Sequence, residues 1–388
     1  MKIAFLTCEY PHPKAHFSAG IGTSIFNLSN GLIAQGHEVI IVLYGQDKDE
    51  FFSENGISFY KIKNVKLKGF SWWLTQKKIQ KLICSLVDLK KIEIVEVADW
   101  TGISSNIKLN CPLVIKLHGS DTYFCYLDHR PVKMINRLRE KRALKKADAW
   151  ASVSQYVAIM TQKIFGLKND FKVLPNGIDL EKFSLSKHLI PEESQVILYF
   201  GSIIRKKGLL ELALIFNEVI KLNPHAKLIL IGRDTPDAIT QNPSTWQMML
   251  SLFDGKAKAQ VSYLGSVSYS EIKKHIEAAT VCVFPSFAEA LPVSWLEAMA
   301  LQKAIVASDI GWATEIIDQG IDGYLVDPKN HEQFAQKIND LLQNQALRIK
   351  IGQKARQKVE RKFSKEIVAQ QNVSFYESVL KAYKTKKG

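Results

Sequence analysis

Two carboxylates stand eight residues apart in a stretch that is otherwise almost wholly apolar, from Phe284 to Ala300. Glu289 follows a Pro-Ser turn, and Glu297 lies in a predicted helix whose other residues are nearly all apolar. A buried carboxylate needs partners, because an unpaired buried charge costs several kcal/mol or shifts its pKa. Pro292 suits the first turn of that helix, where the N–H that proline lacks has no helical partner anyway. Free N–H groups at a helix start favour an anion, so the stretch predicts a ligand site.

A basic loop from Gly201 to Gly208 is the second candidate, because it follows one predicted strand and opens a predicted helix. Arg205 and Lys207 in this loop carry the charge that phosphate requires. The loop is not a P-loop, since the spacing and the residue after the lysine are wrong. A solvated basic loop is the alternative interpretation. Another predicted strand end, at Gly232, is expected at the same sheet edge.

The glycines of the first loop, Gly20 and Gly22, also follow a strand and precede a helix, so they could cradle a phosphate. The dinucleotide fingerprint needs a third glycine where Ile25 stands, and an acid where Leu43 and Tyr44 stand. A nicotinamide enzyme is therefore poorly supported. A tight turn into a helix is the alternative.

His118 follows a predicted strand and precedes Gly119, a place that lies near the crevice of a doubly wound domain. A surface or structural role is the alternative for a lone histidine. Asp47 and Asp49 resemble a metal-binding pair, but they lie in a run of charged residues that is typical of a solvated turn. We therefore assign neither a metal nor a cofactor.

The elements that must position these residues come in two series of alternating strands and helices, separated by the polar segment 185–195. At 388 residues the chain is also too long for one ordinary core. The fold class is therefore α/β, with two doubly wound Rossmann-like domains that face each other across a crevice. We expect domains at 1–187 and 188–363, followed by a helix at 364–388 that packs back on the first domain.

Composition narrows the classes of protein. Five scattered cysteines indicate neither a disulfide framework nor a zinc site, and no apolar run approaches the length of a membrane span. The first residues read as a strand rather than a signal peptide, so we expect a cytoplasmic protein. The net charge of +14 favours an anionic partner without choosing among nucleic acid, anionic lipid and phosphorylated substrates.

The predicted helix at 131–146 is strongly basic and, with Arg130, carries eight cations against Glu140 alone. Val132, Ile135 and Leu138 could form its buried stripe. Such a helix suits the surface of an anionic membrane, which the protein would then contact through Arg130–Lys146. A plain solvated helix is the alternative, and no recognised module supports nucleic-acid binding.

Taken together, these motifs resemble those of the retaining glycosyltransferases of family 4, which have the GT-B fold. The resemblance covers nearly the whole chain, and its most specific element is the pair of glutamates in the Phe-Pro-Ser context. It rests on the following segments in order: Gly20, His118-Gly119, Val173–Asp179, Gly201…Lys207-Gly208, Tyr263-Leu-Gly265, Phe284-Pro-Ser…Glu289…Glu297 and Asp322–Val326.

The resemblance implies a role for each matching residue. Glu297 would bind the ribose of a nucleotide-sugar, and Glu289 would hold sugar hydroxyls close to the anomeric carbon. Lys207 would neutralise the diphosphate, together with Arg205, because Ser202 stands where the family commonly has arginine. The remaining implied contacts with the donor come from the backbone at Gly20, Gly22, Gly232, Ala290, Leu291 and Pro292, and from His118 beside the reacting sugar.

The implied activity is retaining, metal-independent transfer of a sugar from a nucleoside-diphosphate sugar to a glycan or lipid-linked acceptor. Synthesis of bacterial cell-surface polysaccharide or glycolipid is the implied setting, at the inner face of the membrane. Two alternatives stay open at this point. One is a sugar-nucleotide epimerase or hydrolase of the same fold, and the other is a non-catalytic basic protein that binds membranes or nucleic acid.

Overall fold

The computed structural model describes residues 1–16, 18–168, 170–185, 195–268 and 271–387. The chain forms two compact units, of which the first comprises Met1–Ile178 with Phe363–Gly388 and the second comprises Asp179–Lys362. The predicted boundary between residues 187 and 188, and most of the predicted linker, lie outside the described residues.

The first unit is built on an eight-stranded sheet in the order β3-β4-β2-β1-β5-β6-β7-β8. All neighbouring strands are parallel except β3 and β4. The strands are β1 (Lys2–Thr7), β2 (Glu38–Gln46), β3 (Glu50–Glu54), β4 (Ile57–Lys63), β5 (Ile94–Ala98), β6 (Leu113–Leu117), β7 (Ala149–Ser152) and β8 (Lys172–Val173). The sequence did not predict β3, which directly follows the run of charged residues that was interpreted as a solvated turn.

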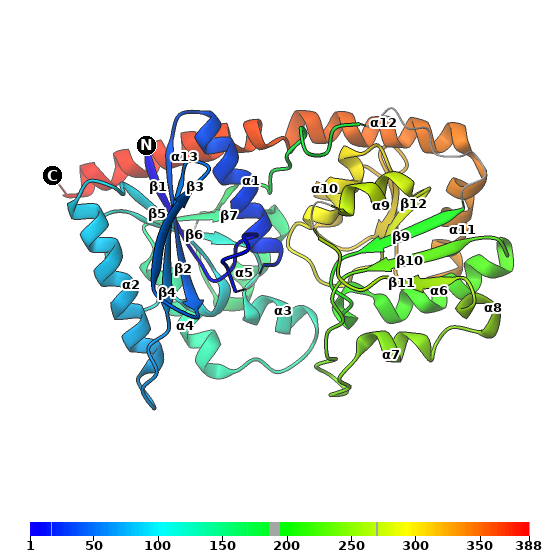
Figure 1. Ribbon diagram of the computed structural model, residues 1–388, viewed down its shortest axis with the longest axis horizontal. Coiled ribbons are helices and arrows are strands. Elements are labelled where there is room, and N and C mark those ends of the chain that lie inside the picture. The colour runs from blue at the N-terminus through cyan, green and yellow to red at the C-terminus, as the bar shows by residue number, and fades with distance from the viewer. Residues whose placement is uncertain (17, 169, 186–194, 269–270, 388) are drawn as a thin grey trace. The chain divides into compact units, whose positions relative to one another are not determined.

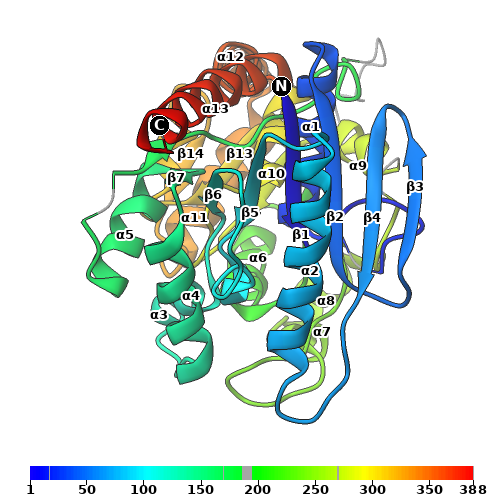
Figure 2. The same cartoon turned by 90° about the vertical axis from the view of Figure 1, so that its left-hand side faces the viewer.

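Helices cover both faces of this sheet, as alternation along each strand requires. On β1, Ile3 and Phe5 join a core with α1 (Gly20–Ala34) and α13 (Lys365–Lys387), whereas Ala4 and Leu6 join a core with α2 (Ser71–Asp88). Figures 1 and 2 show these helices flanking the sheet. The unit also contains α3 (Asp121–Leu127), α4 (Met134–Lys146), α5 (Gln155–Phe165) and a 3-10 turn, η1 (Trp100–Gly102).

Helix α13 is attached to the first sheet by polar contacts as well as by apolar ones. Buried Lys116 on β6 donates to the Asn372 side chain at 3.2 Å, and the Tyr376 hydroxyl donates to Glu96 on β5 at 2.6 Å. Burying a polar group is costly unless it is hydrogen-bonded, so these bonds favour a single position of α13 on the sheet. The carboxyl-terminal helix is therefore an integral layer of the first unit.

The second unit has a six-stranded, wholly parallel sheet in the order β11-β10-β9-β12-β13-β14. Its strands are β9 (Val196–Phe200), β10 (Lys227–Ile231), β11 (Val261–Tyr263), β12 (Val281–Phe284), β13 (Ala304–Ser308) and β14 (Tyr324–Val326). Its helices are α6 (Leu209–Leu222), α7 (Thr245–Leu250), α8 (Gly255–Lys258), α9 (Ile272–Ala278), α10 (Val293–Ala300), α11 (His331–Gln343) and α12 (Gln345–Lys362), with 3-10 turns η2 (Arg205–Lys207) and η3 (Ala313–Glu315).

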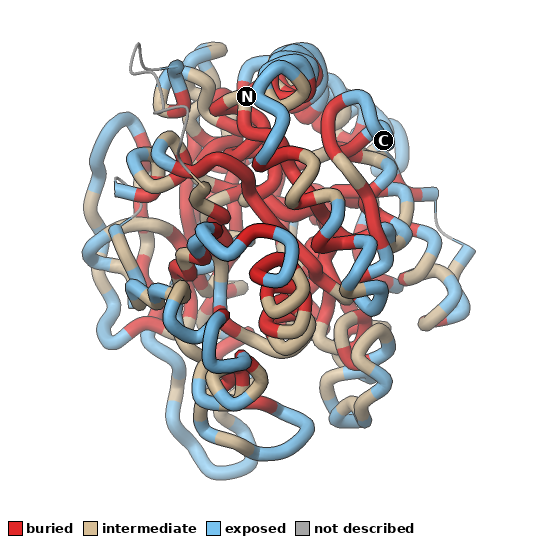
Figure 3. Tube along the Cα trace, turned by 90° about the vertical axis from the view of Figure 1, so that its right-hand side faces the viewer, coloured by how far each residue is buried: buried red, intermediate tan, exposed pale blue. Residues whose placement is uncertain are grey.

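Burial in the second unit follows from this layering, since a parallel sheet is covered on both faces. Strands β12 and β13 consist entirely of buried residues, and all residues of α10 except Ser294 are buried. Figure 3 shows buried segments enclosed by more exposed helical turns. Across the part of the chain that the structure describes, no helix combines the length and the hydropathy that a membrane crossing requires.

Candidate active site

Both sheets change the direction of winding once. In the second unit the chain moves outward from β9 to β10 and β11, and then returns to the other side of β9 as β12. Doubly wound sheets bind ligands at such a switch point, beyond the carboxyl ends of the strands. The two loops that leave this point are 201–208 after β9 and 285–292 after β12, which are the two basic and acidic stretches that the sequence singled out.

These two loops are packed tightly against each other. Gly208 has φ +69°, and a Cβ added to it would lie 1.8 Å from the carbonyl oxygen of Pro285. The carbonyl oxygen of Lys206 accepts hydrogen bonds from the backbone N–H groups of Phe287 at 2.8 Å and Ala288 at 3.2 Å. Only glycine fits both the backbone angle and the close approach. The loops therefore hold each other in a defined position.

Gly232, at the end of β10, makes a second close approach. Its φ is +146°, and an added Cβ would lie 1.8 Å from the carbonyl oxygen of Gly201. The Tyr263 hydroxyl donates to the carbonyl of Gly232 at 2.8 Å. The structure thus gives this glycine a packing role behind the basic loop, and its proposed contact with a donor stays a prediction.

The central contact of the site is an ion pair between the two loops. The Lys207 ammonium lies 2.9 Å from Oε1 of Glu289, and the Ser286 hydroxyl donates to the same oxygen at 3.2 Å. The side chains of Lys207 and Glu289 are 20% and 12% exposed, so both are reachable but largely shielded from water. Partial shielding strengthens an electrostatic contact relative to one in water. The ion pair is therefore strengthened by its surroundings and still accessible to a charged ligand.

The Arg205 side chain forms an ion pair with Asp237. Its guanidinium binds Asp237, which follows β10, through two hydrogen bonds of 2.8 and 2.9 Å. The hydrogen bond from Arg205 lowers the pKa of Asp237 well below its usual range, although burial opposes the shift. This bidentate pair ties the loops after β9 and β10 together. The structure joins Lys207, rather than Arg205, to Glu289.

The residues before α10 differ in detail from the sequence expectation. Pro292 is the N-cap, with ψ 120°, so the helix begins at Val293, and Ala290 and Leu291 lie in the turn before it. Both are buried, at 8% and 4% exposure. A proline in extended conformation ends the turn and starts the helix one residue later than predicted. The sequence therefore predicted this helix in the right segment and misplaced its first residue by one position.

Glu297 lies within α10 and is 5% exposed. Its neighbourhood includes Lys182, whose pKa burial lowers while the carboxylates of Glu297 and Asp179 oppose that shift. No motif in the sequence pointed to Lys182. Its only signal is its place three residues after Asp179, at the end of a segment that the resemblance had already marked.

The switch point of the first unit lies between β1 and β5, and buried carboxylates occupy it. Glu9, in the loop after β1, accepts a hydrogen bond of 2.6 Å from the backbone N–H of Gly22, at the start of α1. Burial raises the pKa of Glu9, and the hydrogen bonds from Gly22 and Ile21 oppose this. A Cβ on Gly22 would lie 3.1 Å from the backbone of Glu9 and Tyr10, whereas one on Gly20 would meet nothing within 4 Å. The sequence did not single out Glu9.

Asp99, which follows β5, holds the turn that carries His118. Its Oδ1 accepts from the backbone N–H of His118 at 2.9 Å, and its Oδ2 has no hydrogen-bond partner among the described residues. Burial raises the pKa of Asp99 to about 7, the hydrogen bond from His118 opposes the shift, and the charge of Glu140 adds to it. Burial also lowers the pKa of the His118 imidazole to about 3, with help from the charge of Lys116. His118 is therefore a neutral imidazole near pH 7.

The aspartates that resemble a metal site are paired with lysines. Asp47 lies 3.0 Å from the Lys61 ammonium, and Asp49 lies 2.6 Å from that of Lys78. No group of three or more potential metal ligands occurs among the described residues. The arrangement is a surface charge cluster beside β3 and β4.

Two family models match the chain one after the other. Residues 18–182 match the model of Glycosyltransferase Family 4, and residues 181–358 match that of Glycosyl transferases group 1. The chain belongs to the family 4 glycosyltransferases.

This family 4 glycosyltransferase is 26% identical to an uncharacterized glycosyltransferase of Methanocaldococcus jannaschii, over 97% of this chain and 98% of the relative. It is also 26% identical to alpha-monoglucosyldiacylglycerol synthase of Acholeplasma laidlawii, over 80% of each chain. Among solved structures, sucrose-phosphate synthase from Thermosynechococcus elongatus superposes with a TM-score of 0.81 at 18% identity, covering 98% of this chain and 100% of that one. The fold is GT-B.

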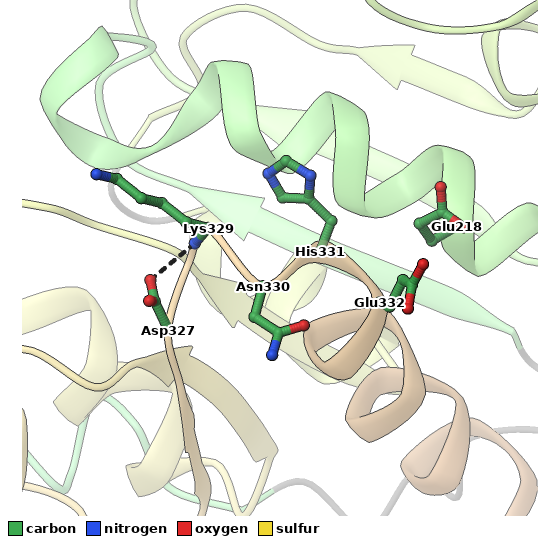
Figure 4. A pocket seen from close by; sticks show the side chains of 6 residues that line it. All are labelled: Glu218, Asp327, Lys329, Asn330, His331 and Glu332. Carbon is green, nitrogen blue, oxygen red and sulfur yellow. Dashed lines mark hydrogen bonds between the residues drawn. The ribbon is translucent and has the colours of Figure 1, made fainter.

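A pocket of about 440 Å³ lies in the second unit of the glycosyltransferase, and no predicted site residue lines it. One of its lining residues, Lys329, places its ammonium 6.0 Å from the ring centroid of Phe287 in the loop after β12. Figure 4 shows this pocket between the start of α11 and the side of α6. His331 bridges the two helices, with Nε2 2.5 Å from Oε2 of Glu211. Three of its lining residues are acidic (Glu218, Asp327 and Glu332), so the pocket does not suit a diphosphate.

Proposed function

We propose that this protein transfers a sugar, with retention of anomeric configuration and without a metal ion, from a nucleoside-diphosphate sugar to a hydroxyl group of a glycan or lipid-linked acceptor. The Lys207–Glu289 ion pair carries this proposal, because it puts a cation and a carboxylate together at the switch point of the second sheet. A departing diphosphate needs the first group, and a sugar hydroxyl can be held by the second.

The barrier to transfer is departure of the diphosphate, which develops negative charge on its oxygens. Lys207 meets that charge after exchanging Glu289 for the phosphate, and the exchange costs little because the ammonium stays paired throughout. Preorganised charges of this kind are usually the largest contribution to catalysis. The released Glu289 then accepts hydrogen bonds from the sugar. The backbone N–H groups of Ala290 and Leu291 face the donor beside it.

In this proposal the acceptor attacks the anomeric carbon from the same face as the departing diphosphate, and this gives retention of configuration. The acceptor oxygen bonds to the anomeric carbon as the bond from that carbon to the diphosphate oxygen breaks. The acceptor proton passes to the departing diphosphate, so no protein base is required. Glu297 holds the ribose hydroxyls. His118 contributes a neutral imidazole, which can hydrogen-bond the sugar without opposing the positive charge that develops on it.

Arg205 has a smaller part in this proposal than the resemblance implied. Its charge is already balanced by Asp237, so it supports the loop that carries Lys207. Lys182 becomes a further candidate near Glu297 on the nucleotide side of the site.

A lipid or lipid-linked acceptor is favoured by one relative, since the name of the Acholeplasma laidlawii synthase specifies a diacylglycerol glucoside. The same name specifies an alpha-linked product, which is the outcome of retention from an alpha-linked donor.

The test is product analysis with a panel of nucleoside-diphosphate sugars, chosen first by the thermal shift that each produces. We expect transfer only when an acceptor is present, an anomeric proton coupling in the product that matches the donor, and unchanged turnover in EDTA. An inverted anomer, sugar release or epimerisation without an acceptor, or a requirement for a divalent ion would contradict the proposal.

A further inference from the structure

Charge is unevenly distributed over the first unit. Residues 55–87 contain no acidic residue, although they contain seven lysines (Lys61, Lys63, Lys66, Lys68, Lys77, Lys78 and Lys81). The stretch 130–146 contains one acidic residue, Glu140, against eight cations. Glu140 is buried and accepts hydrogen bonds from the backbone N–H groups of Asp121 and Thr122, so it adds no negative charge to the surface. Lys61 is buried and pairs with Asp47, and Lys78 pairs with Asp49. The other five lysines of 55–87 are exposed, so both stretches present cations to the solvent.

Large apolar side chains stand exposed in the same two stretches. The sequence offered Val132, Ile135 and Leu138 as a possible buried stripe. For Ile135 and Leu138 this is wrong, because α4 buries Glu140, Ala143 and Leu144 instead. Six side chains share this exposure, ranging from 47% to 65%: Leu67, Phe70 and Trp73 before and within the first turn of α2, and Met134, Ile135 and Leu138 in the first turns of α4. Exposed apolar groups of this size that gather among cations indicate an interaction surface.

The fold brings the two groups to one end of the first unit. Helix α2 follows β4, and α4 follows β6 by way of α3, so both begin at the carboxyl edge of the parallel sheet. Figures 1 and 2 both show the segment that leads into α2 and the start of α4 at that end. Trp72 connects them, because the Arg139 guanidinium lies 4.5 Å above its ring. His118 and the Gly20–Gly22 turn are at the same sheet edge.

Toward the other end of α4, cations from neighbouring segments lie near one another. Burial lowers the pKa of Lys146, and the charges of Arg142, Lys108 and Lys77 lower it further. Like charges repel, and an anionic partner would relieve that repulsion. Lys66, Lys68, Lys133, Arg142 and Lys145 are exposed as well. The surface is therefore complementary to a dense array of negative charges.

We propose that this basic-apolar surface, formed by Leu67, Phe70, Trp73, Met134, Ile135, Leu138 and the surrounding cations, docks on an anionic lipid bilayer. The interface of such a bilayer offers anionic headgroups to the cations and hydrocarbon to the apolar side chains at the same depth. Nucleic acid matches the cations and could stack on Phe70 and Trp73. It offers nothing comparable to the four aliphatic side chains.

Docking would hold the carboxyl edge of the first sheet beside the membrane, where a lipid-linked acceptor resides. This consequence rests on the proposed function, whereas docking itself does not. The two can therefore fail separately.

The experiment is co-sedimentation of the full chain with vesicles of phosphatidylcholine, alone or mixed with phosphatidylglycerol, without donor or acceptor. We expect binding to the mixed vesicles that decreases as salt is added, and little binding to phosphatidylcholine alone. Phe70→Ser/Trp73→Ser and Ile135→Ser/Leu138→Ser should each reduce partitioning at least about tenfold, because each removes two apolar groups from the lipid interface. These side chains are exposed, so the melting temperature should not change.

Ile321→Ser is the matched control, since Ile321 is 56% exposed in the second unit. Its vesicle binding should equal that of the unaltered protein. Equal losses in Ile321→Ser and the double variants would overturn the proposal, as would absent binding to anionic vesicles. Displacement of the protein from vesicles by single-stranded DNA, with the same loss of DNA binding in the double variants, would show nucleic acid to be the partner. Concentration-dependent self-association that the double variants abolish would show a second copy to be the partner.

Discussion

The switch points of the two sheets have the same topology and opposite chemistry. In the second unit a cation and a carboxylate from two loops face each other, Lys207 and Glu289, and both remain partly exposed. In the first unit two carboxylates, Glu9 and Asp99, are buried under the backbone N–H groups of their own unit, and burial raises the pKa of each. One strand order therefore supports two different electrostatic environments.

The difference shows where an anionic ligand can bind. At the first switch point, Glu9 accepts a hydrogen bond from the backbone N–H of Gly22 at the start of α1. This carboxylate partly neutralises the positive end of the α1 dipole. At the second, the Lys207 ammonium is partly exposed beside Glu289, where a phosphate could replace that carboxylate as its partner. The proposed diphosphate site therefore lies in the second unit, and the role of His118 in the first unit stays a prediction.

Among the variants that test this difference between the two units, Lys207→Ala should have the largest effect, which is on turnover. Lys207→Ala should reduce turnover by about 10²–10³-fold, because no preorganised cation then meets the departing diphosphate. Steady-state kinetics with the best nucleotide-sugar measure this. Lys221→Ala is the control, since Lys221 forms a surface ion pair with Glu218 in the same unit and should be neutral. Near-normal turnover of Lys207→Ala would contradict the role proposed for Lys207 in stabilising the departing diphosphate.

The glycines that open the two helices should respond differently to a methyl group. Gly208→Ala should lower the free energy of unfolding by at least about 2 kcal/mol, since it combines an unfavourable φ with a clash against Pro285. Gly20→Ala should be neutral or slightly stabilising, because its Cβ would meet nothing within 4 Å. Denaturant unfolding measures both. Similar losses in the two variants would show that the loops are equally constrained.

The two glutamates of the second unit should separate binding from transfer. Glu297→Gln should weaken binding of a nucleoside diphosphate about tenfold, the usual cost of losing a hydrogen bond to a charged group. Glu289→Gln should slow transfer at least about tenfold while leaving that binding unchanged or tighter, because Lys207 loses an internal competitor. Calorimetry and turnover measured on both variants test the division. Equal effects on binding would contradict it.

The last effect is expected at Asp99, and it depends on pH. Its pKa is about 7 in the folded protein and near 3.8 when unperturbed, so between these values the unfolded chain has lost a proton that the folded chain retains. Stability therefore falls as pH rises from about 4 to about 7 and is constant above. Asp99→Asn keeps the acceptor for the His118 N–H and cannot ionise.

The melting temperature of Asp99→Asn relative to the unaltered protein should therefore rise by a few °C between about pH 5 and about pH 8. Thermal unfolding at the two pH values measures it. A difference that does not vary with pH would mean that Asp99 titrates normally.

Several features could be predicted from the chain alone because they are local or periodic. The alternation of buried strands and helices predicted two parallel α/β sheets, and the family motifs predicted the GT-B fold. The missed element, β3, is an antiparallel edge strand of five residues, and such short polar strands form only when a neighbour such as β4 supplies their hydrogen bonds. The roles of Glu289, Glu297 and His118 stay predictions.

Other features were beyond the reach of sequence patterns because partners distant in the chain decide them. No pattern in the sequence indicated that Arg205 pairs with Asp237, 32 residues away, and its contact with a phosphate stays a prediction. Ile135 and Leu138 looked like a core stripe, but α4 buries Glu140, Ala143 and Leu144 instead, and Glu140 accepts hydrogen bonds from the first backbone N–H groups of α3. Helical period alone does not say which face finds a neighbour.

The two glutamates at Phe284–Ala300 show both limits. The sequence by itself determined that carboxylates stand in an apolar stretch after a buried strand, since residue type and spacing are properties of the chain. Only the tertiary structure decided that Glu289 meets Lys207 across two interlocked loops, that Glu9 serves the start of α1, and that Asp99 lies behind His118. Each of these depends on which strands become neighbours, and that is a property of the packed sheet.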